Sequence, residues 1–338
     1  MRELDAAAAG AADFNILILG QNGRLAKEAV LFAASLRQNS PGFRGRLIVA
    51  EPQPEGAWEG EDTLIPDAER AYLQACGAEI LPFVATHFGK AYPYGNKIEA
   101  MALLPAQQPF IFFDSDTLIL SPLDAMQIDF SRPSASMRRE GTWPKPPLYG
   151  PDYADIWGAL YQRFGLDMDS TLDLNFGPSD WRRYLYFNAG WYLGDDPATF
   201  GARFVDWAAE LRADPGPVLA CQTLDPWPDQ VILPLVVHSL GGGRPGPELD
   251  GLDGDVSSHY RSFSLMYARQ PDAVLTAFEA LAADPEIAAI FAEDEGFQQV
   301  YLAGRGQSEI RPLFAHGLYR TEQPYRAALR WRKLWFRG

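Results

Sequence analysis

Short apolar runs alternate with helical patterns over the first third of this 338-residue chain. Four runs have the length of strands, at residues 14–19, 46–50, 78–84 and 109–113. Apolar residues at intervals of three and four predict three helices between them, at residues 25–37, 67–76 and 96–104. Regular alternation of strands and helices is typical of a mainly parallel sheet flanked by helices. We therefore predict an α/β fold of this kind.

The alternation is less regular after residue 121. A segment at 141–165 is rich in proline, glycine, tryptophan and tyrosine, and its pattern becomes helical near Tyr153. Beyond it we predict a strand pair or a strand with a turn at 184–193, helices at 199–211 and 229–240, a loop at 241–255 and helices in two pieces at 271–303. The domains predicted from this pattern are a loose leader at 1–13, an α/β domain at 14–265 with halves at 14–120 and 121–265, and a helical C-terminal extension at 266–338.

Composition and charge exclude several classes of protein. Hydrophobic residues make up 47% of the chain, which is enough for a sizeable core and excludes global disorder. The net charge of −15 argues against a nucleic-acid partner, because phosphate backbones attract basic surfaces. The two cysteines form no CxxC motif, no apolar run has the length of a membrane span, and the first residues do not resemble a signal peptide. We therefore predict a cytoplasmic protein.

Two carboxylates one residue apart follow the apolar strand at 109–113. The stretch FFDSDTLIL places Asp114 and Asp116 between strongly apolar flanks, which puts the pair at the edge of a core rather than in a solvated turn. Mg²⁺ and Mn²⁺ prefer oxygen ligands and often lie between carboxylates and substrate phosphates. We therefore predict a metal or phosphate site here. A phosphatase with a DxDxT motif is disfavoured because Thr117 follows Asp116 directly.

A loose dinucleotide fingerprint suggests an alternative. The stretch LGQNGRLA places Gly20 and Gly23 between a strand and a helix, and Glu51 ends the next strand, where a ribose ligand would lie. Such glycine matches are weak alone, and a turn with a close helix–strand contact is the more ordinary explanation. An NAD(P)-binding protein built on these three residues is the alternative, although it leaves the two aspartates unexplained.

Four motifs follow one another along the chain, namely YPYGNKIEAMALLP, FFDSDTLIL, YFNAGWYL and WPDQVILPLVV. In this order they resemble a helix, the DxD strand, the FN[AS]G strand and the DQ-headed helix of nucleotide-sugar-dependent glycosyltransferases with the GT-A fold, closest to glycosyltransferase family 8. The resemblance covers residues 14–240. It implies metal-dependent transfer of a sugar from a nucleotide-diphosphate sugar to an acceptor, with retention at the anomeric carbon. It also implies that the half at 14–120 binds the donor and the half at 121–265 the acceptor.

The resemblance implies that Asp114 and Asp116 bind Mn²⁺ or Mg²⁺ and, through it, the diphosphate of the donor. Ser115 between them is then a donor-binding residue. Lys97 matches the basic residue that meets the donor. A lysine at the start of a helix offers a point charge to a phosphate, which agrees with that role.

The two later motifs imply sugar-binding and catalytic residues. Asn188 and Gly190 match the floor of the sugar site, and the amide of Asn188 offers a donor and an acceptor to sugar hydroxyls. Asp229 and Gln230 match the residues near the anomeric carbon and are the predicted catalytic pair. Asp229 also stands where an N-cap aspartate is expected, and it could stabilise an oxocarbenium-like transition state electrostatically.

The chain departs from the family at the third metal ligand, because the motif HxxGxxKPW is absent. We predict His259, in DGDVSSHYRSF, as that ligand, with His316, in LFAHGLYRTEQPYR, as second choice. Arg261 or Arg320 would then replace the missing lysine at the diphosphate.

The C-terminal tail inverts the charge of the chain. It carries six basic residues and one acidic residue, and its apolar side chains are interleaved with the basic ones, at Trp331, Leu334, Trp335 and Phe336. This mixture suits an amphipathic helix on an anionic membrane. We predict peripheral contact of residues 319–338 with the inner face of the cell membrane. A helix docked on the acidic body of the protein is the alternative.

The sequence therefore predicts a metal-dependent glycosyltransferase of hexosyltransferase type. Its partners are a nucleotide-sugar donor and a saccharide or lipid-linked acceptor, whose identities stay open. A non-catalytic sugar- or partner-binding module on a degenerate transferase fold is a further alternative.

Overall fold

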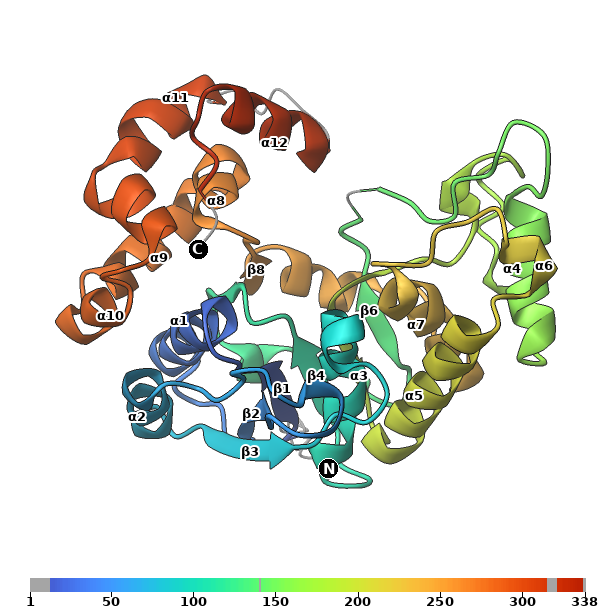
Figure 1. Cartoon of the computed structure of the whole chain (residues 1–338), viewed down its shortest axis with the longest axis horizontal. Coiled ribbons are helices and arrows are strands. Elements are labelled where there is room, and N and C mark those ends of the chain that lie inside the picture. Colours follow the sequence, from blue (N-terminus) through green and yellow to red (C-terminus); the bar gives the residue numbers. More distant parts are fainter. Residues whose placement is uncertain (1–12, 140, 315–320, 337–338) are drawn as a thin grey trace, which may run out of the picture.

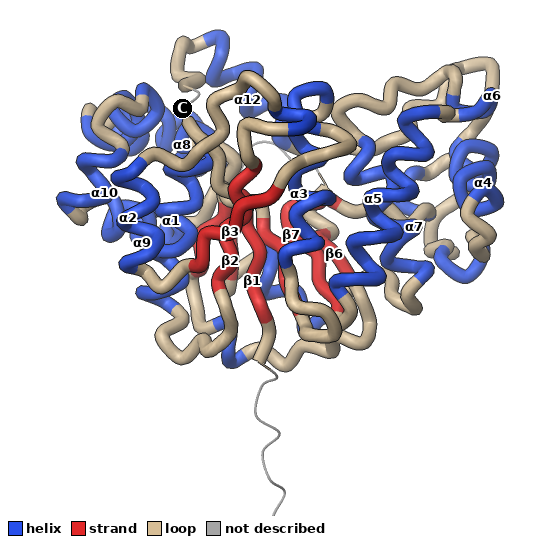
Figure 2. The backbone as a smooth tube through the Cα atoms, turned by 60° about the horizontal axis from the view of Figure 1, so that its bottom comes forward, coloured by secondary structure: helices blue, strands red, loops and turns tan. Residues whose placement is uncertain are grey.

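A computed structural model describes residues 13–139, 141–314 and 321–336 of the chain. Its centre is a six-stranded sheet with the order β3-β2-β1-β4-β7-β6 (Figures 1 and 2). The strands are β1 Asn15–Leu19, β2 Leu47–Pro52, β3 Glu79–Phe83, β4 Phe110–Phe113, β6 Ser134–Ser136 and β7 Asn188–Gly194. The first four run parallel, whereas β7 is antiparallel to both β4 and β6. The predicted α/β fold, with a mixed but mainly parallel sheet, is confirmed.

Helices cover both faces of this sheet (Figure 2). The α-helices are α1 Arg24–Asn39, α2 Asp67–Ala75, α3 Asn96–Glu99, α4 Tyr153–Arg163, α5 Pro197–Ala213, α6 Gly216–Leu219, α7 Pro228–Ser239, α8 Phe263–Arg269, α9 Asp272–Ala282, α10 Pro285–Ile290, α11 Arg311–Leu313 and α12 Glu322–Trp331. Alternate residues of a strand point to opposite faces, so the sheet divides the apolar residues into two cores. In β4, Ile111 and Phe113 join the core under α1, and Phe110 and Phe112 join the core under α5 and α7.

Of the two alternatives predicted for residues 184–193, the strand pair is wrong. A single strand, β7, begins at Asn188, and residues 184–187 are buried without joining a ladder. The partner of β7 is instead β6, only three residues long, whose sequence SAS has no apolar run to reveal it. The predicted loop at 241–255 also contains a 3₁₀ helix, Pro247–Asp253.

Two short strands outside the main sheet bring distant segments together. β5 Thr117–Ile119 follows β4 directly, and it pairs antiparallel with β8 Ser257–His259. The register places Thr117 opposite His259. Residues more than a hundred positions apart in the sequence therefore meet beside the end of β4.

The segment from α8 to α12 packs beside α1 and then returns toward the end of the sheet (Figure 1). Tyr325, Leu329 and Leu334 are buried in the core on this side. The predicted boundaries at residues 13 and 265 stay predictions, and most of the predicted leader lies outside the described residues. No helix in the described part of the chain has the length and apolar character to cross a membrane.

Candidate active site

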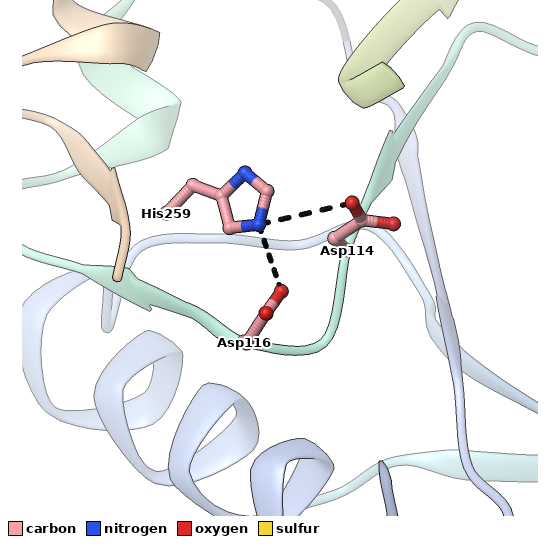
Figure 3. A group of neighbouring side chains, drawn as sticks. All are labelled: Asp114, Asp116 and His259. Carbon is pink, nitrogen blue, oxygen red and sulfur yellow. Dashed lines mark ion pairs between the residues drawn. The ribbon is translucent and has the colours of Figure 1, made fainter. Parts of the chain in front are cut away.

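Three potential metal ligands meet at the end of β4 (Figure 3). One ligand atom from each of Asp114, Asp116 and His259 lies within 4.8 Å of the others. The Nε2 atom of His259 is 3.0 Å from Oδ1 of Asp116 and 3.8 Å from Oδ2 of Asp114. The structure therefore brings together the two aspartates and the histidine selected from the sequence. The second choice, His316, lies outside the described residues.

Backbone hydrogen bonds hold this group in place. The N–H of Asp114 donates to the carbonyl of Gly190 on β7 at 2.8 Å, and the N–H of Tyr260 donates to the carbonyl of Asp116 at 2.9 Å. The hydroxyl of Ser115 donates to the carbonyl of Leu19 at 2.6 Å, so this predicted donor-binding residue attaches the loop to β1. The two aspartates are thus fixed to two strands of the sheet and to the residue after β8.

Gly190 leaves space for the imidazole. A Cβ at this position would lie 2.4 Å from Nδ1 of His259 and 2.9 Å from Oδ1 of Asn188. The side-chain oxygen of Asn188 accepts the N–H of Gly190 at 2.7 Å. Any residue larger than glycine would therefore displace the histidine from the two aspartates.

Positive side chains favour the charged form of Asp116. Burial alone raises the pKa of this carboxyl, but the charges of His259, Arg24 and Arg261 outweigh burial and hold the pKa well below its usual value. The guanidinium of Arg24 is 3.5 Å from Asp116 and 2.6 Å from Glu28. Burial, with Asp116 nearby, raises the pKa of Glu28 well above its usual range. The neighbouring cations thus favour the ionised form of Asp116, whereas burial favours the protonated form of Glu28.

Lys97 lies between two carboxylates rather than at the surface. Its ammonium is 2.6 Å from Asp114 and 3.4 Å from Asp229, and it donates to the carbonyl of Ala189 at 3.2 Å. The side chain is only 6% exposed. Burial lowers its pKa, but the charges of the two aspartates raise the pKa by more, so the lysine stays protonated. Lys97 therefore links the predicted metal site to the predicted catalytic pair.

Asp229 is buried in the first turn of α7, and it is not the N-cap, which is Trp227. The hydroxyl of Tyr92 donates to Oδ1 of Asp229 at 2.8 Å and accepts the N–H of Asp229 at 3.0 Å. Burial raises the pKa of Asp229, against the opposing effects of Lys97 and the hydrogen bond from Tyr92. Beside it, Gln230 accepts a hydrogen bond from the hydroxyl of Tyr186 at 2.7 Å. Sequence reasoning missed Tyr92, although this residue begins the first of the four motifs.

The C-terminal segment closes one side of the site. Arg261, which has a φ of 67°, donates to Glu322 at the start of α12 at 2.5 Å. Glu322 is buried and also forms ion pairs with Arg269 and Arg326. The guanidinium predicted to meet the diphosphate is thus held by a residue of the tail. Arg320, the other candidate, lies outside the described residues.

These groups share one cavity of about 620 Å³. All of the predicted site residues with described positions line it except Ser115 and Gly190. Residues missed from the sequence also line it, namely Arg24, Lys27, Tyr186, Trp227, Gln323, Arg326 and Trp335. Arg24 and Lys27 follow the glycine fingerprint, and their position in the first turn of a helix after a strand was the available signal.

The alternative dinucleotide site is occupied by protein contacts. The carboxylate of Glu51 accepts hydrogen bonds from Arg70, from Gln53 and from the N–H of Ile65. A Cβ at Gly20 would lie 2.6 Å from Val49, which indicates a close approach of the residue after β1 to β2. The fingerprint is therefore explained by packing.

Comparison with known proteins identifies the family. A family model described as the Rhodobacterales glycosyltransferase domain matches residues 16–241. Galactosyltransferase LgtC, solved in complex with donor and acceptor sugar analogues, is 14% identical, with a TM-score of 0.44 over 84% of this chain and 99% of that chain. The glycosyltransferase GlyE of Streptococcus pneumoniae TIGR4 is 12% identical, with a TM-score of 0.43 over 84% of this chain and 64% of that chain. No curated protein matches the sequence. Since the family model spans well over half of the residues, the chain belongs to the Rhodobacterales glycosyltransferase domain family and is a glycosyltransferase.

Proposed function

We propose that this glycosyltransferase transfers a sugar from a nucleotide-diphosphate sugar to a saccharide or lipid-linked acceptor, with a metal ion and with retention at the anomeric carbon. The observation that carries the proposal is the meeting of Asp114, Asp116 and His259 at the end of β4, inside the cavity of about 620 Å³. LgtC was solved with donor and acceptor sugar analogues, and the same classes of substrate are proposed here.

The donor set fits Mn²⁺ or Mg²⁺. Two carboxylate oxygens and one imidazole nitrogen converge from one side, and the cavity leaves the other side open to substrate oxygens. Oxygen donors suit both ions, and the imidazole favours Mn²⁺ over Mg²⁺. When bound, the ion neutralises charge on the leaving nucleoside diphosphate. We propose that Asp114, Asp116 and His259 hold it.

The other predicted residues have separate roles in this proposal. Lys97 favours the ionised form of Asp229 beside Asp114, so that the negative charge of Asp229 faces the position of the transferred sugar. Tyr92 fixes the orientation of that carboxylate through two hydrogen bonds. Gln230 and Asn188 offer amide groups to sugar hydroxyls. Arg261 lies at the phosphate end and exchanges part of its contact with Glu322 for the diphosphate.

Thermal unfolding with nucleotide sugars tests the proposal. We expect one donor to raise the Tm of the full chain only when Mn²⁺ or Mg²⁺ is present, because a ligand that binds only the folded state stabilises it. The double variant Asp114→Asn, Asp116→Asn should keep its fold and lose this metal-dependent shift. It should also lose on the order of 10³-fold in turnover, the size of several kcal/mol of lost charge stabilisation. The control is Asp272→Asn, on the exposed side of α9.

An absence of any metal-dependent shift across a full panel of nucleotide sugars would contradict the proposal. Metal-dependent binding that survives in the double variant would contradict the assigned ligands only. Retention has its own test, because NMR of the first-formed product distinguishes the two anomers. Binding of a donor without any turnover toward water or acceptors would favour the non-catalytic sugar-binding alternative.

We also propose peripheral contact of residues 319–338 with an anionic membrane on the cytoplasmic side. Support comes from Trp331, which is 79% exposed beside Arg330, Arg332 and Lys333. Three other apolar residues of the tail are engaged by the protein itself, namely Leu334, Trp335 and Phe336. The contact therefore depends on charge and on one tryptophan.

Co-sedimentation with anionic liposomes tests this contact. The variant Arg330→Gln, Arg332→Gln, Lys333→Gln should bind several-fold less than the natural chain, since each basic residue near the surface contributes about 1 kcal/mol. The variant Arg46→Gln, which changes charge on the opposite part of the molecule, is the control. Equal binding by all three proteins would contradict the proposed contact.

A further inference from the structure

The cations that line the cavity fall into two groups. Arg24, Lys97, Arg261 and Arg326 form ion pairs with carboxylates of the protein. By contrast, no ion pair with a described carboxylate is formed by Lys27, Arg139 or Lys145, which also line the cavity. Charged side chains in a partly buried site are usually paired. Because Lys145 is exposed, this expectation applies to the half-buried Lys27 and Arg139, whose charges indicate a place for an anion from outside the chain.

Arg139 is the most constrained member of this group. Its guanidinium lies over the ring of Trp181, 4.6 Å from the centroid, and Nη1 donates to the carbonyl of Tyr186 at 3.3 Å. Its Nε atom is buried and has no hydrogen-bond partner among the described residues. Burial, with the charge of Arg244 nearby, lowers the pKa of Arg139 to about 10. The guanidinium is thus held in one orientation, no described residue accepts a hydrogen bond from Nη2, and the charge of Asp173 acts on it without forming an ion pair.

The position of Arg139 separates it from the diphosphate end. Lys97 links Asp114 of the predicted metal site to Asp229, the first residue of the predicted catalytic pair. Gln230 follows, and its side chain is bonded to Tyr186, the residue whose carbonyl receives Arg139. The sugar attached to the diphosphate would lie near Asp229. Among the described contacts, Arg139 is linked through Tyr186 to Gln230 and not to the three predicted metal ligands, which favours the acceptor side of the cavity over the diphosphate end.

Lys145 also lines this cavity, and hydrogen bonds to other segments fix the loop that carries it. Its N–H donates to Oε1 of Gln222 at 2.8 Å, and its carbonyl accepts from Nε2 of the same residue at 3.0 Å. Two residues earlier, the indole of the buried Trp143 donates to the carbonyl of Thr223 at 3.1 Å. The backbone is thus fixed, while the ammonium of Lys145 extends from an exposed side chain.

We propose that Arg139, assisted by Lys145, binds a carboxylate or phosphate group of the acceptor, so that this enzyme glycosylates an anionic saccharide or an anionic lipid-linked acceptor. A guanidinium with free donors suits such groups because it can give two parallel hydrogen bonds. The inference rests on the proposed function, since it names the class of acceptor for the same site.

Calorimetric titration of the full chain tests the inference. The probes are methyl β-D-glucuronide and glucose 6-phosphate, with methyl β-D-glucoside as the neutral counterpart. We expect the two anionic probes to bind more tightly than the glucoside. The variant Arg139→Gln should lower the affinity for the two anionic probes at least about 10-fold, and Lys145→Gln should lower it about 3-fold. Binding of the glucoside should be unchanged in both variants. Arg46→Gln, which removes the same charge from an exposed ion pair with Glu79 outside the cavity, is the matched control.

Binding of charged and neutral probes with equal affinity, or no millimolar binding of either anionic probe, would overturn the inference. Arg139→Lys keeps the charge without the planar fork, and it should retain part of the preference. Thermal unfolding verifies the fold of each variant, and Lys145→Gln decides the question if substitution of Arg139 prevents folding.

Two further measurements identify the source of the anion. Arg139→Gln could weaken binding of a nucleoside diphosphate with Mn²⁺ as much as it weakens binding of the glucuronide. Arg139 would then contact donor phosphates, and the inference is overturned. The same holds if the loss is confined to a nucleotide-uronic acid, since the anion would then belong to the donor sugar. Failure of the proposed function is distinct from both results, because it appears as an absence of metal-dependent donor binding in the natural chain.

Discussion

Two regions built in different ways face each other across the cavity. The first, here called the sheet wall, consists of Lys97, Asp114, Asp116 and Asp229, on the ends of strands and on the helices packed against them. The second, the tail roof, consists of Glu322, Gln323, Arg326 and Trp335, in and after α12. Both line the same space, but the wall belongs to the sheet that defines the fold, and the roof is added at the end of the chain.

The two regions also balance charge differently. In the wall, one buried lysine lies between two aspartates, and backbone hydrogen bonds fix the strand ends that carry them. In the roof, one buried carboxylate, that of Glu322, forms ion pairs with Arg261, Arg269 and Arg326. Removing one charge from either region leaves its partners buried and unbalanced. The comparison predicts loss of global stability in the wall and local detachment in the roof.

Lys97→Met is the substitution with the largest expected effect. It leaves Asp114 and Asp229 facing each other without the cation between them, and breaking a buried pair in this way costs about 3–5 kcal/mol. Urea denaturation should show this loss in the free energy of unfolding. The control Lys90→Met breaks an exposed pair with Glu61 and should cost at most about 1 kcal/mol. A similar small loss for both variants would contradict the importance of charge in the wall.

Glu322→Gln should have a smaller effect, confined to the roof. The variant keeps the shape of the side chain but removes the charge that holds three arginines, at an expected cost of about 1–3 kcal/mol. Hydrogen exchange of the native protein should become faster in α12 and stay unchanged in β1 and β4, because α12 opens before the sheet. Donor affinity should fall as Trp335 and Arg326 leave the cavity.

The control for this experiment is Glu309→Gln, which removes an exposed carboxylate paired with Arg305 four residues away. It should not alter exchange in α12. Faster exchange throughout the sheet in Glu322→Gln would show that the roof is part of the global unfolding unit, and the distinction between the two regions would then be wrong.

The same division explains what the sequence could predict. The sheet wall can be predicted from the sequence because a local apolar run indicates a strand, and Asp114 and Asp116 come directly after such a run. The FN[AS]G and DQ motifs are likewise local. The pairing of β5 with β8 could not be predicted from the sequence, since both strands are three residues long and they are more than a hundred positions apart.

The roof was harder to predict because basic and aromatic residues suit several environments. The sequence of the tail predicts a surface for lipid, with docking on the body of the protein as the alternative. In the structure Leu334 is buried and only Trp331 of the four interleaved apolar residues is exposed. The decisive feature was Glu322, a single acidic residue among basic ones, and its burial depends on arginines contributed by α8 and the turn before it.

Tyr92→Phe should have the smallest effect, and it tests whether the wall is held by charge alone. The hydroxyl both donates to the carboxylate of Asp229 and accepts its N–H, so the variant removes two hydrogen bonds and keeps the aromatic packing. We expect about 1–2 kcal/mol less stability by urea denaturation and a fall of up to about tenfold in turnover, because Lys97 still holds the charge. The control is Tyr301→Phe, whose ring packs on Phe278 and Phe297 away from the cavity. If Tyr92→Phe lost as much turnover as Asp229→Asn, orientation by this hydroxyl, rather than pairing with Lys97, would be what makes Asp229 effective.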